Sequence, residues 1–448
     1  MTGPIWSWPL AMLRDDIAAR RVSPVEAVTA VIGRIESRRQ INAFINVTAE
    51  RALADARERE QAVMRGDALG PLHGVPIALK DNIATRGVET TAGSPVRAGW
   101  IPEADADVVV ALRAAGAIVI GKNNLFEAAF GAAHPRFGET LNPWDQTLSC
   151  GGSSSGSAAA VADGQAFGAI GTDTGGSIRI PATMCGLVGL KLTNGLVSNR
   201  GVIPVSPGLD VVGPIARSIR DAELMLAGMG AKDVRREPPR PPETIGIPAD
   251  LGRTPLAPQA ERAMNVAKRR LERQGFRLRE VTLPKSALSL DVMWTIASAD
   301  IAEYYRNELG RRPEDFCPQV RRNLIAGSMI PAVDYIRARR LQRHIRRRMA
   351  EAFSDVDVVL MPSMAIAPYP SGAERVSLAG KEYDVLPAIM QFTPLANVSG
   401  YPALIAPVEP ATAGPPPTVQ LYGRPYEESA LLSIGAILER LSGPPPGV

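Results

Sequence analysis

Cysteine, histidine and lysine are scarce in this sequence, and long apolar runs are absent. The three cysteines among 448 residues (Cys150, Cys185 and Cys317) are too few and too scattered for a disulfide framework or a zinc site. We therefore expect a reducing, cytoplasmic environment. No stretch reaches the ~18 uninterrupted apolar residues of a membrane span, so no membrane partner is expected. The first residues lack a basic segment followed by an apolar one, so no secretory signal is expected.

Charge and hydrophobicity are ordinary for a folded chain. Hydrophobic residues are 45% and charged residues 21%, which excludes a disordered polymer. The net charge of +4 is mild, and the one dense basic run lies at Arg337–Arg348. A nucleic-acid patch is one interpretation of that run. A helix with a solvated arginine face is favoured, because apolar residues recur at helical spacing (Tyr335, Ile336, Leu341, Ile345, Met349 and Phe353).

The order of apolar segments predicts an α/β fold. Residues 11–65 are typical of helices, and Ser23 with Glu26 forms a capping-box pattern for a helix that begins at Pro24. A short apolar run over 74–79 stops at Lys80. A helix over 107–115 and a strand over 117–120 follow it. This alternation favours a mixed, mostly parallel central sheet covered by helices on both faces. Later strands are expected at 245–247, 276–283, 357–361, 403–408 and 418–422, and helices at 51–64, 258–274 and 429–441.

Two familiar motifs match only in part. Gly116–Lys122 has phosphate-loop spacing, but Asn123 stands where the magnesium-binding Ser or Thr belongs. Gly152–Gly156 fits G-x-S-x-G, but the segment before it is poor strand material. A Ser-His-Asp triad also needs a suitably placed histidine, and the chain offers only His73, His134 and His344. Nucleotide binding and α/β-hydrolase chemistry are therefore disfavoured.

Three other segments carry a stronger signal together than singly. Lys80 ends an apolar strand, where the alternative is a lysine that reaches out to solvent. Residues 150–161 (CGGSSSGSAAAV) form a Ser/Gly loop that opens an Ala-rich helix, where the alternative is a flexible linker. Residues 171–181 (GTDTGGSIRIP) place paired glycines before Ser177, where the alternative is an ordinary tight turn.

In this order, the three segments resemble the amidase signature family. The matching stretches are 74–83, 151–162, 171–181 and 185–191, and residues 393–402 are also similar. The resemblance implies an amidohydrolase with a Ser–cis-Ser–Lys triad. Ser177 would be the nucleophile, Ser153 the bridging serine, and Lys80 the base and acid. No cofactor and no metal are implied.

The resemblance also implies the groups around the triad. The N–H groups of Thr174, Gly175, Gly176 and Ser177 would form the oxyanion hole. Ser154 would support the loop, as would a buried pair of Asp173 and Arg179, although a surface pair is the alternative for these two. Lysine acts as a base only when neutral. An ordinary lysine pKa near 10.4 must therefore fall, and burial behind the apolar run 75–79 would lower it.

The resemblance further implies one large domain. Residues 1–66 would be a helical region packed on the core, and 67–230 the catalytic core. Residues 231–352 would be a variable segment that completes the α/β domain and the pocket, and 353–448 the last strands and helix. A charged, Pro-rich linker is expected at 231–242, and a frayed tail at 443–448.

Substrate and partners are less constrained. The candidate substrate-binding residues Phe126, Phe130, Met361 and Phe392 favour a small aryl or alkyl amide, although such residues can also fill the core. The alternative function is the glutaminase (A) subunit of a tRNA-dependent amidotransferase. A non-catalytic RNA- or protein-binding module that uses the Arg337–Arg348 helix is a third interpretation. We expect a homodimer that acts on a small-molecule amide, with no nucleic-acid partner.

Overall fold

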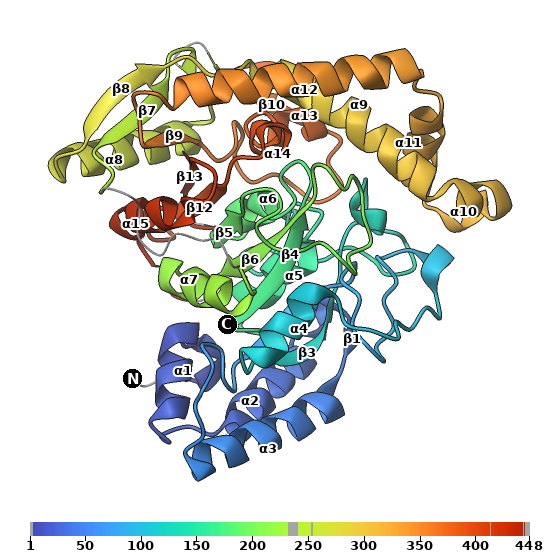
Figure 1. The fold of residues 1–448 in the computed structure, drawn as a ribbon, viewed down its shortest axis with the longest axis vertical. Helices are drawn as coiled ribbons and strands as arrows, with labels where there is room; N and C mark the ends of the chain where they lie inside the picture. Colours follow the sequence, from blue (N-terminus) through green and yellow to red (C-terminus); the bar gives the residue numbers. More distant parts are fainter. Residues whose placement is uncertain (1–2, 232–240, 252–253, 413, 442, 444–448) are drawn as a thin grey trace.

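A central sheet of 11 strands runs through the computed structural model, which describes residues 3–231, 241–251, 254–412, 414–441 and 443 (Figure 1). The strand order is β1-β3-β2-β4-β6-β5-β12-β13-β9-β7-β8, and β10 and β11 form a separate pair. The strands are β1 Phe44–Val47, β2 Pro76–Lys80, β3 Ile118–Asn123, β4 Gly168–Asp173, β5 Val188–Lys191, β6 Val211–Ala216, β7 Thr244–Pro248, β8 Arg277–Val281, β9 Val358–Pro362, β10 Arg375–Leu378, β11 Lys381–Asp384, β12 Ala403–Pro407 and β13 Thr418–Gly423. Most of the expected linker at 231–242 and of the expected frayed tail lies outside the described residues.

The predicted α/β class with a mixed sheet is confirmed, and its parallel pairs form two runs. Strands β3, β2 and β4 are parallel neighbours, and so are β9, β7 and β8. The middle of the sheet, from β4 through β6, β5, β12 and β13 to β9, is antiparallel. The β5–β12 pairing joins the strands that precede residue 231 to those that follow it.

Helices cover both faces of the sheet, as expected (Figure 1). They are α1 Leu10–Ala18, α2 Pro24–Ser37, α3 Ala49–Arg65, α4 Asp107–Ala114, α5 Ser155–Ala162, α6 Arg179–Met184, α7 Ile219–Gly228, α8 Pro258–Arg273, α9 Ser286–Tyr304, α10 Arg306–Arg311, α11 Pro318–Ser328, α12 Ala332–Ala352, α13 Val385–Ile389, α14 Pro394–Ser399 and α15 Glu428–Leu438. Helix α5 packs on β2, β3, β4 and β6, whereas α9, α11, α12 and α14 pack on one another. None of the helices in the described ranges is long and apolar enough to cross a membrane.

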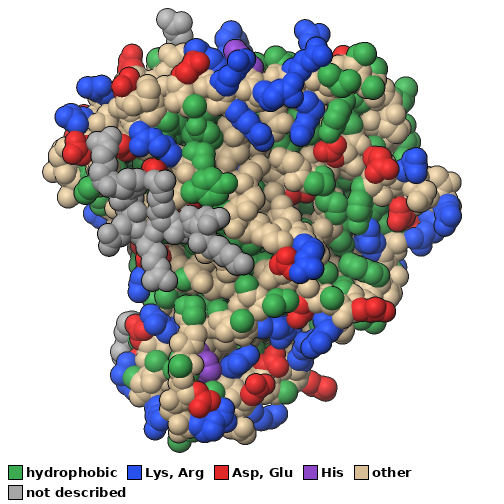
Figure 2. Space-filling model, in the orientation of Figure 1, with side chains coloured by type: hydrophobic (Ala, Val, Ile, Leu, Met, Phe, Trp, Pro, Cys, Tyr) green, Lys and Arg blue, Asp and Glu red, His purple; other side chains and the backbone are tan. Residues whose placement is uncertain are grey.

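Local sequence accounts for two of these helices. The capping box of α2 is present, since the Ser23 hydroxyl accepts a hydrogen bond from the Glu26 N–H and the Glu26 carboxylate accepts one from the Ser23 N–H. Helix α12 buries Ile345 and Met349 and exposes most of its arginines, and Lys and Arg side chains gather along the upper edge of the molecule in Figure 2, where Figure 1 places α12. Ile336 is a correction to the expected apolar face, because it is 49% exposed.

The sheet brings the two ends of the candidate site together. Strands β2 and β4 are parallel neighbours with Leu79 opposite Ile170, so the carboxyl ends of both strands lie at one edge. Lys80 ends β2, and the loop that follows Asp173 leaves β4 at the same edge. Helices α5 and α6 begin close to these strand ends. This edge of a sheet is where α/β proteins commonly bind ligands.

Candidate active site

Lys80 is a fully buried lysine surrounded by oxygen atoms. Its Nζ lies 2.8 Å from Ser153 Oγ, 2.8 Å from Thr172 Oγ1 and 3.4 Å from the Thr172 carbonyl oxygen. A neutral amine has two N–H groups and one lone pair. The two Thr172 oxygens can accept the two N–H groups, which leaves the lone pair to accept the Ser153 hydroxyl proton. The same three oxygens can also accept the three N–H groups of the ammonium, so the site can hold Lys80 in either protonation state.

The charge state of Lys80 follows from the same burial. Loss of hydration lowers the pKa of the amine to about 7, although the carboxylates of Asp173 and Asp210 oppose part of this fall. At neutral pH a substantial fraction of Lys80 is therefore uncharged and able to accept a proton. Asn82 fixes the Thr172 hydroxyl, since its Nδ2 donates to Thr172 Oγ1 over 3.1 Å.

Ser153 lies in the loop that opens α5, and the Gly152–Ser153 peptide bond is cis. Glycine at 152 leaves room for Phe126, because a Cβ there would lie 2.3 Å from the Phe126 ring and the ring would have to move. The loop is tied to its neighbour when the Ser154 N–H donates to the Ser177 carbonyl oxygen over 3.2 Å. Ser154 Oγ donates to the Thr172 carbonyl oxygen over 3.3 Å, so this hydroxyl points into the protein and not toward substrate.

Ser177 and Ser153 both line one pocket, which is open to solvent on one side. The loop between β4 and Ser177 contributes to this pocket, and Gly176 adopts a φ of +138° that favours glycine. A Cβ at Gly176 would also lie 2.5 Å from Thr393 Oγ1. Thr393 Oγ1 donates to the Gly175 carbonyl oxygen over 2.6 Å, which turns that carbonyl toward α14.

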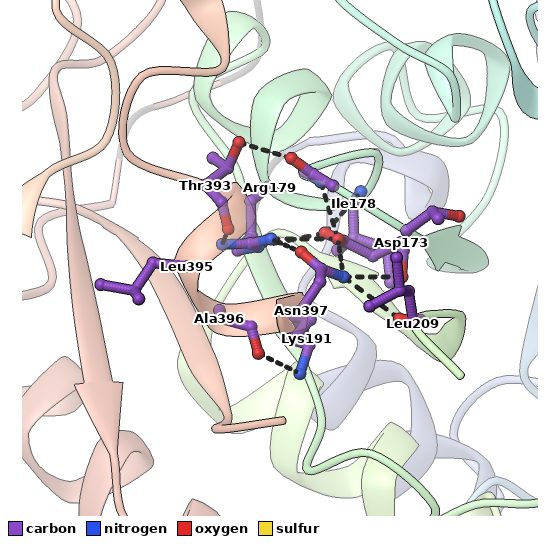
Figure 3. Close-up of polar contacts among 12 residues, drawn as sticks. Asp173, Ile178, Arg179, Lys191, Leu209, Thr393, Leu395, Ala396 and Asn397 are labelled. Carbon is purple, nitrogen blue, oxygen red and sulfur yellow. Dashed lines mark hydrogen bonds and ion pairs between the residues drawn. The ribbon is translucent and has the colours of Figure 1, made fainter. Parts of the chain in front are cut away.

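A buried ion pair anchors this loop, as Figure 3 shows. Arg179 lies 3.0 Å from Asp173, and both side chains are fully buried. Arg179 also donates to the Thr393 carbonyl oxygen, to Gln420 and to Asn397. Burial alone would raise the pKa of Asp173, but Arg179 and the hydrogen bonds around the carboxylate lower it to about 2. Asp173 is therefore charged at neutral pH, and the alternative of a surface pair is excluded.

The N–H groups of the loop divide into two sets. The Asp173 carboxylate accepts hydrogen bonds from the N–H groups of Gly176 and Ile178, over 2.8 and 3.1 Å. The prediction that the Gly176 N–H belongs to the oxyanion hole is therefore wrong, because this N–H donates to the Asp173 carboxylate. Among the described hydrogen bonds, the N–H groups of Thr174, Gly175 and Ser177 have no acceptor, so they remain as candidate donors.

The pocket wall is apolar, and it includes only half of the expected substrate residues. Phe126 and Phe130 line it, whereas Met361 and Phe392 do not, and these two are corrections. Met361 is buried in β9, and Phe392 is buried next to β13, where its carbonyl oxygen accepts hydrogen bonds from Gln420 and Tyr422. The remaining wall consists mainly of Ile180, Val205, Met293, Trp294, Ala297, Leu386, Ile389 and Met390. Trp294 packs edge-to-face on Phe130 with ring centroids 5.2 Å apart.

The residues of the partial phosphate-loop match and the histidines that a Ser-His-Asp triad would need make structural contacts instead. Lys122, from the partial phosphate-loop match, is buried in β3 and pairs with Asp81 at 3.1 Å. His73 contacts the Arg59 carbonyl oxygen through Nε2, and His134 caps a turn through Nδ1, so neither serves a Ser154 nucleophile. Within the described ranges, no group of three or more His, Cys, Asp or Glu side chains is placed to hold a metal ion.

Known proteins resemble this chain over nearly its whole length. A family model described as Amidase matches residues 26–432. The glutamyl-tRNA(Gln) amidotransferase (A) subunit of Chloroflexus aggregans is 36% identical over 470 residues, which cover 95% of this chain and 94% of the relative.

Solved structures agree with the sequence match. A protein from a complex described as vestigial, which reveals the evolutionary origins of an s-triazine catabolic enzyme, superposes with a TM-score of 0.90 and 31% identity. The superposition covers 97% of this chain and 100% of that one. The glutamyl-tRNA(Gln) amidotransferase (A) subunit of Thermotoga maritima gives a TM-score of 0.78 and 27% identity, and covers 99% of both chains.

Proposed function

Because the chain belongs to the amidase signature family, whose enzymes hydrolyse C–N amide bonds, we propose that it cleaves a carboxylic amide through an acyl-enzyme on Ser177. One observation supports this above all. A buried amine with a pKa of about 7 lies 2.8 Å from Ser153 Oγ, and Ser153 shares a pocket with Ser177. A serine hydroxyl becomes a competent nucleophile only when a neighbouring group removes its proton.

The first half of the reaction forms the acyl-enzyme. Ser177 Oγ attacks the carbonyl carbon and gives its proton to Ser153 Oγ, while Ser153 passes its own proton to Lys80. The carbonyl oxygen becomes an oxyanion, which accepts hydrogen bonds from the N–H groups that the loop leaves free. When the C–N bond breaks, Lys80 returns the proton through Ser153 to the leaving nitrogen. Ammonia or an amine departs, and the acyl group stays on Ser177.

The second half repeats the transfer with water. Water gives a proton through Ser153 to Lys80 and attacks the ester carbon. The C–O bond to Ser177 then breaks, and the proton returns to the Ser177 oxygen. The carboxylic acid leaves, and the free enzyme is restored with protons and electrons balanced. Each step uses the same amine as base and then as acid, which a pKa near the working pH favours.

The pocket wall favours an uncharged, apolar acyl group. Among the described residues that line it, none carries a charged side chain, and Phe126, Phe130 and Trp294 supply aromatic surface. A charged substrate would lose its hydration in such a pocket without a compensating partner. This supports a small aryl or alkyl amide.

The relatives favour a second candidate, the glutaminase (A) subunit of a tRNA-dependent amidotransferase. The Chloroflexus aggregans relative, which this chain matches over nearly its whole length, is named for such an enzyme, and one structural neighbour comes from a protein complex. Under this function the chain would release ammonia from glutamine inside a complex. The charged α-amino and α-carboxyl groups of glutamine would then need partners outside the wall described above.

One experiment tests the proposal and separates the two candidates. The purified chain is assayed for ammonia release from glutamine, from short aliphatic amides and from aryl amides, alone and with the other subunits of such an amidotransferase. Rapid turnover of aryl amides by the chain alone supports the apolar amidase. Glutamine turnover that depends on the added subunits supports the glutaminase. A Ser177→Ala variant that keeps wild-type turnover contradicts both.

A further inference from the structure

Asp210 lies directly opposite the loop that carries the nucleophile. Strands β4 and β6 are antiparallel, with Thr172 opposite Val212 and Asp173 opposite Val211. The same register continues one step beyond the strands and sets Thr174 beside Asp210. Thr174 Oγ1 donates a hydrogen bond to Asp210 Oδ1 over 2.6 Å. Thr174 lines the pocket, so this bond fixes a residue whose N–H is a candidate oxyanion donor.

The Asp210 carboxylate accepts three hydrogen bonds, one at Oδ1 and two at Oδ2. Besides the Thr174 hydroxyl, the N–H groups of Val205 and Ser206 donate to Oδ2 over 2.9 and 3.0 Å. Asp210 is only 7% exposed, and it forms no ion pair among those of the described residues. Burial raises its pKa to about 6, although the three donors and Lys80 oppose that rise. A buried carboxylate without an ion-pair partner is costly.

Other buried or partly buried charged groups in this part of the fold already have partners. Asp173 is paired with Arg179 at 3.0 Å, and Lys122 with Asp81 at 3.1 Å. Asp300, on α9, accepts hydrogen bonds from the hydroxyls of Ser206 and Tyr335. Asp173 and Asp210 are therefore the two carboxylates whose charge favours the Lys80 ammonium, and of these only Asp210 has no ion-pair partner among the described residues.

We propose that Asp210 is a positioning residue of the reaction: it holds Thr174 beside Ser177, and its charge stabilises the Lys80 ammonium that forms when the serine proton is transferred. This inference rests on the proposed function. Charges buried away from water interact strongly, so a fixed carboxylate favours the ammonium at the moment when it forms. The bond to Thr174 carries the first role and the charge carries the second, so separate variants can test them.

The variant Asp210→Asn removes the charge with little change in size. An amide has one oxygen and one NH₂ group, so it cannot accept the three donors that the carboxylate accepts. Loss of one oxyanion donor typically costs about a hundredfold to a thousandfold in kcat, so we expect kcat to fall by about tenfold to a hundredfold for a displaced one. Removal of the negative charge lowers the pKa of Lys80. The acid limb of the kcat/KM profile should therefore move to lower pH.

Two further variants separate the roles. Thr174→Val keeps the charge and removes the hydroxyl, so kcat should fall while the acid limb stays in place. Thr174→Ser keeps the hydroxyl and should restore most of kcat. The matched control is Asp221→Asn, which changes another buried carboxylate that does not line the pocket and whose Oδ1 accepts a hydrogen bond from the Ala11 N–H. This control should leave kcat and the pH profile unchanged.

The experiment measures kcat, KM and their pH profiles, together with the rate at which a fluorophosphonate labels Ser177. Slower labelling of Asp210→Asn with a shifted acid limb supports the inference. Wild-type rates in Asp210→Asn or Thr174→Val overturn it, and so does a loss of kcat in Asp210→Asn with an unmoved acid limb. Labelling of the wild type at Ser177 shows that the proposed function stands in either case. Failure to label the wild type overturns both. If Asp210→Asn does not fold, the comparison of Thr174→Val with Thr174→Ser tests the inference: kcat must fall in the first variant and recover in the second.

Discussion

Replacement of Lys80 by methionine should inactivate the protein and remove the free-energy cost of burying its amine. Burial lowers the pKa of Lys80 from 10.5 to about 7. At about 1.4 kcal/mol per pH unit, this shift corresponds to about 5 kcal/mol of unfavourable free energy in the folded protein at pH 7 and below. Methionine has a similar length and no charge, so it removes that cost. The hydroxyls of Ser153 and Thr172 each lose a partner, at about 1–3 kcal/mol apiece, so this loss offsets most of the gain and the change of stability with pH is the decisive measurement.

The dependence on pH is the sharper part of this prediction. Between pH 7 and 10.5 the unfolded chain binds a proton at Lys80 and the folded protein does not, so the stability of the wild type rises with pH. The methionine variant lacks this group. Its stability relative to the wild type should therefore be greatest at pH 7 and below, and should fall by about 2 kcal/mol between pH 7 and pH 9. Urea unfolding of both proteins at pH 7, 8 and 9 measures the difference.

The control is Lys381→Met, which replaces an exposed lysine in β11. Its free energy of unfolding should differ little from that of the wild type at any of the three pH values. A stability difference between Lys80→Met and the wild type that stays constant from pH 7 to pH 9 would refute the reasoning. It would mean that Lys80 is protonated in the folded protein, and Lys80 could then not act as the base.

Three further predictions concern activity and specificity. In the wild type, kcat/KM should rise with pH through about 7, as Lys80 loses its proton, and a pH profile with a neutral amide measures this. Asp173→Asn should lower kcat by about a hundredfold, because the carboxylate aligns the oxyanion loop, and should remove a contribution to stability that is present above pH 3.8 and lost as the pH falls toward 2. Unchanged kcat would exclude this role. Trp294→Ala should lower kcat/KM for aryl amides by about tenfold or more relative to acetamide. The matched variant Met361→Ala should lower stability but not that ratio, and equal ratios in both variants would contradict the assigned wall.

Local sequence predicted most of the elements, because their signals lie within a few residues. The capping box of Ser23 and Glu26 marks the start of α2, and the apolar run before Lys80 marks β2. The antiparallel centre of the sheet had no such signal. Apolar strands buried on both faces have the same composition whichever neighbour they pair with, so the β4–β6 and β5–β12 pairings depend on the whole fold.

In the candidate site, too, the residues in local motifs were predicted and the long-range contacts were not. The family motifs indicated Lys80, Ser153 and Ser177 because each stands in a distinctive local stretch. The contacts of Thr174 with Asp210 and of Asp173 with Asn397 join residues that are 36 and 224 positions apart. The pocket wall was only half predicted. Met361 and Phe130 are both apolar, and both are nearly inaccessible to water in the folded protein. Their residue types therefore do not show that Phe130 faces the pocket and Met361 does not.

All three proposed catalytic residues lie before residue 231, yet the loop that carries the nucleophile depends on the last quarter of the chain. Arg179 holds Asp173, and Arg179 is held in turn by the Thr393 carbonyl oxygen, by Asn397 and by Gln420. Without these acceptors the buried guanidinium would keep one carboxylate and lose three hydrogen bonds, which is costly for a charged group away from water. The β5–β12 pairing that joins the two parts of the sheet is therefore also a condition for an ordered oxyanion loop.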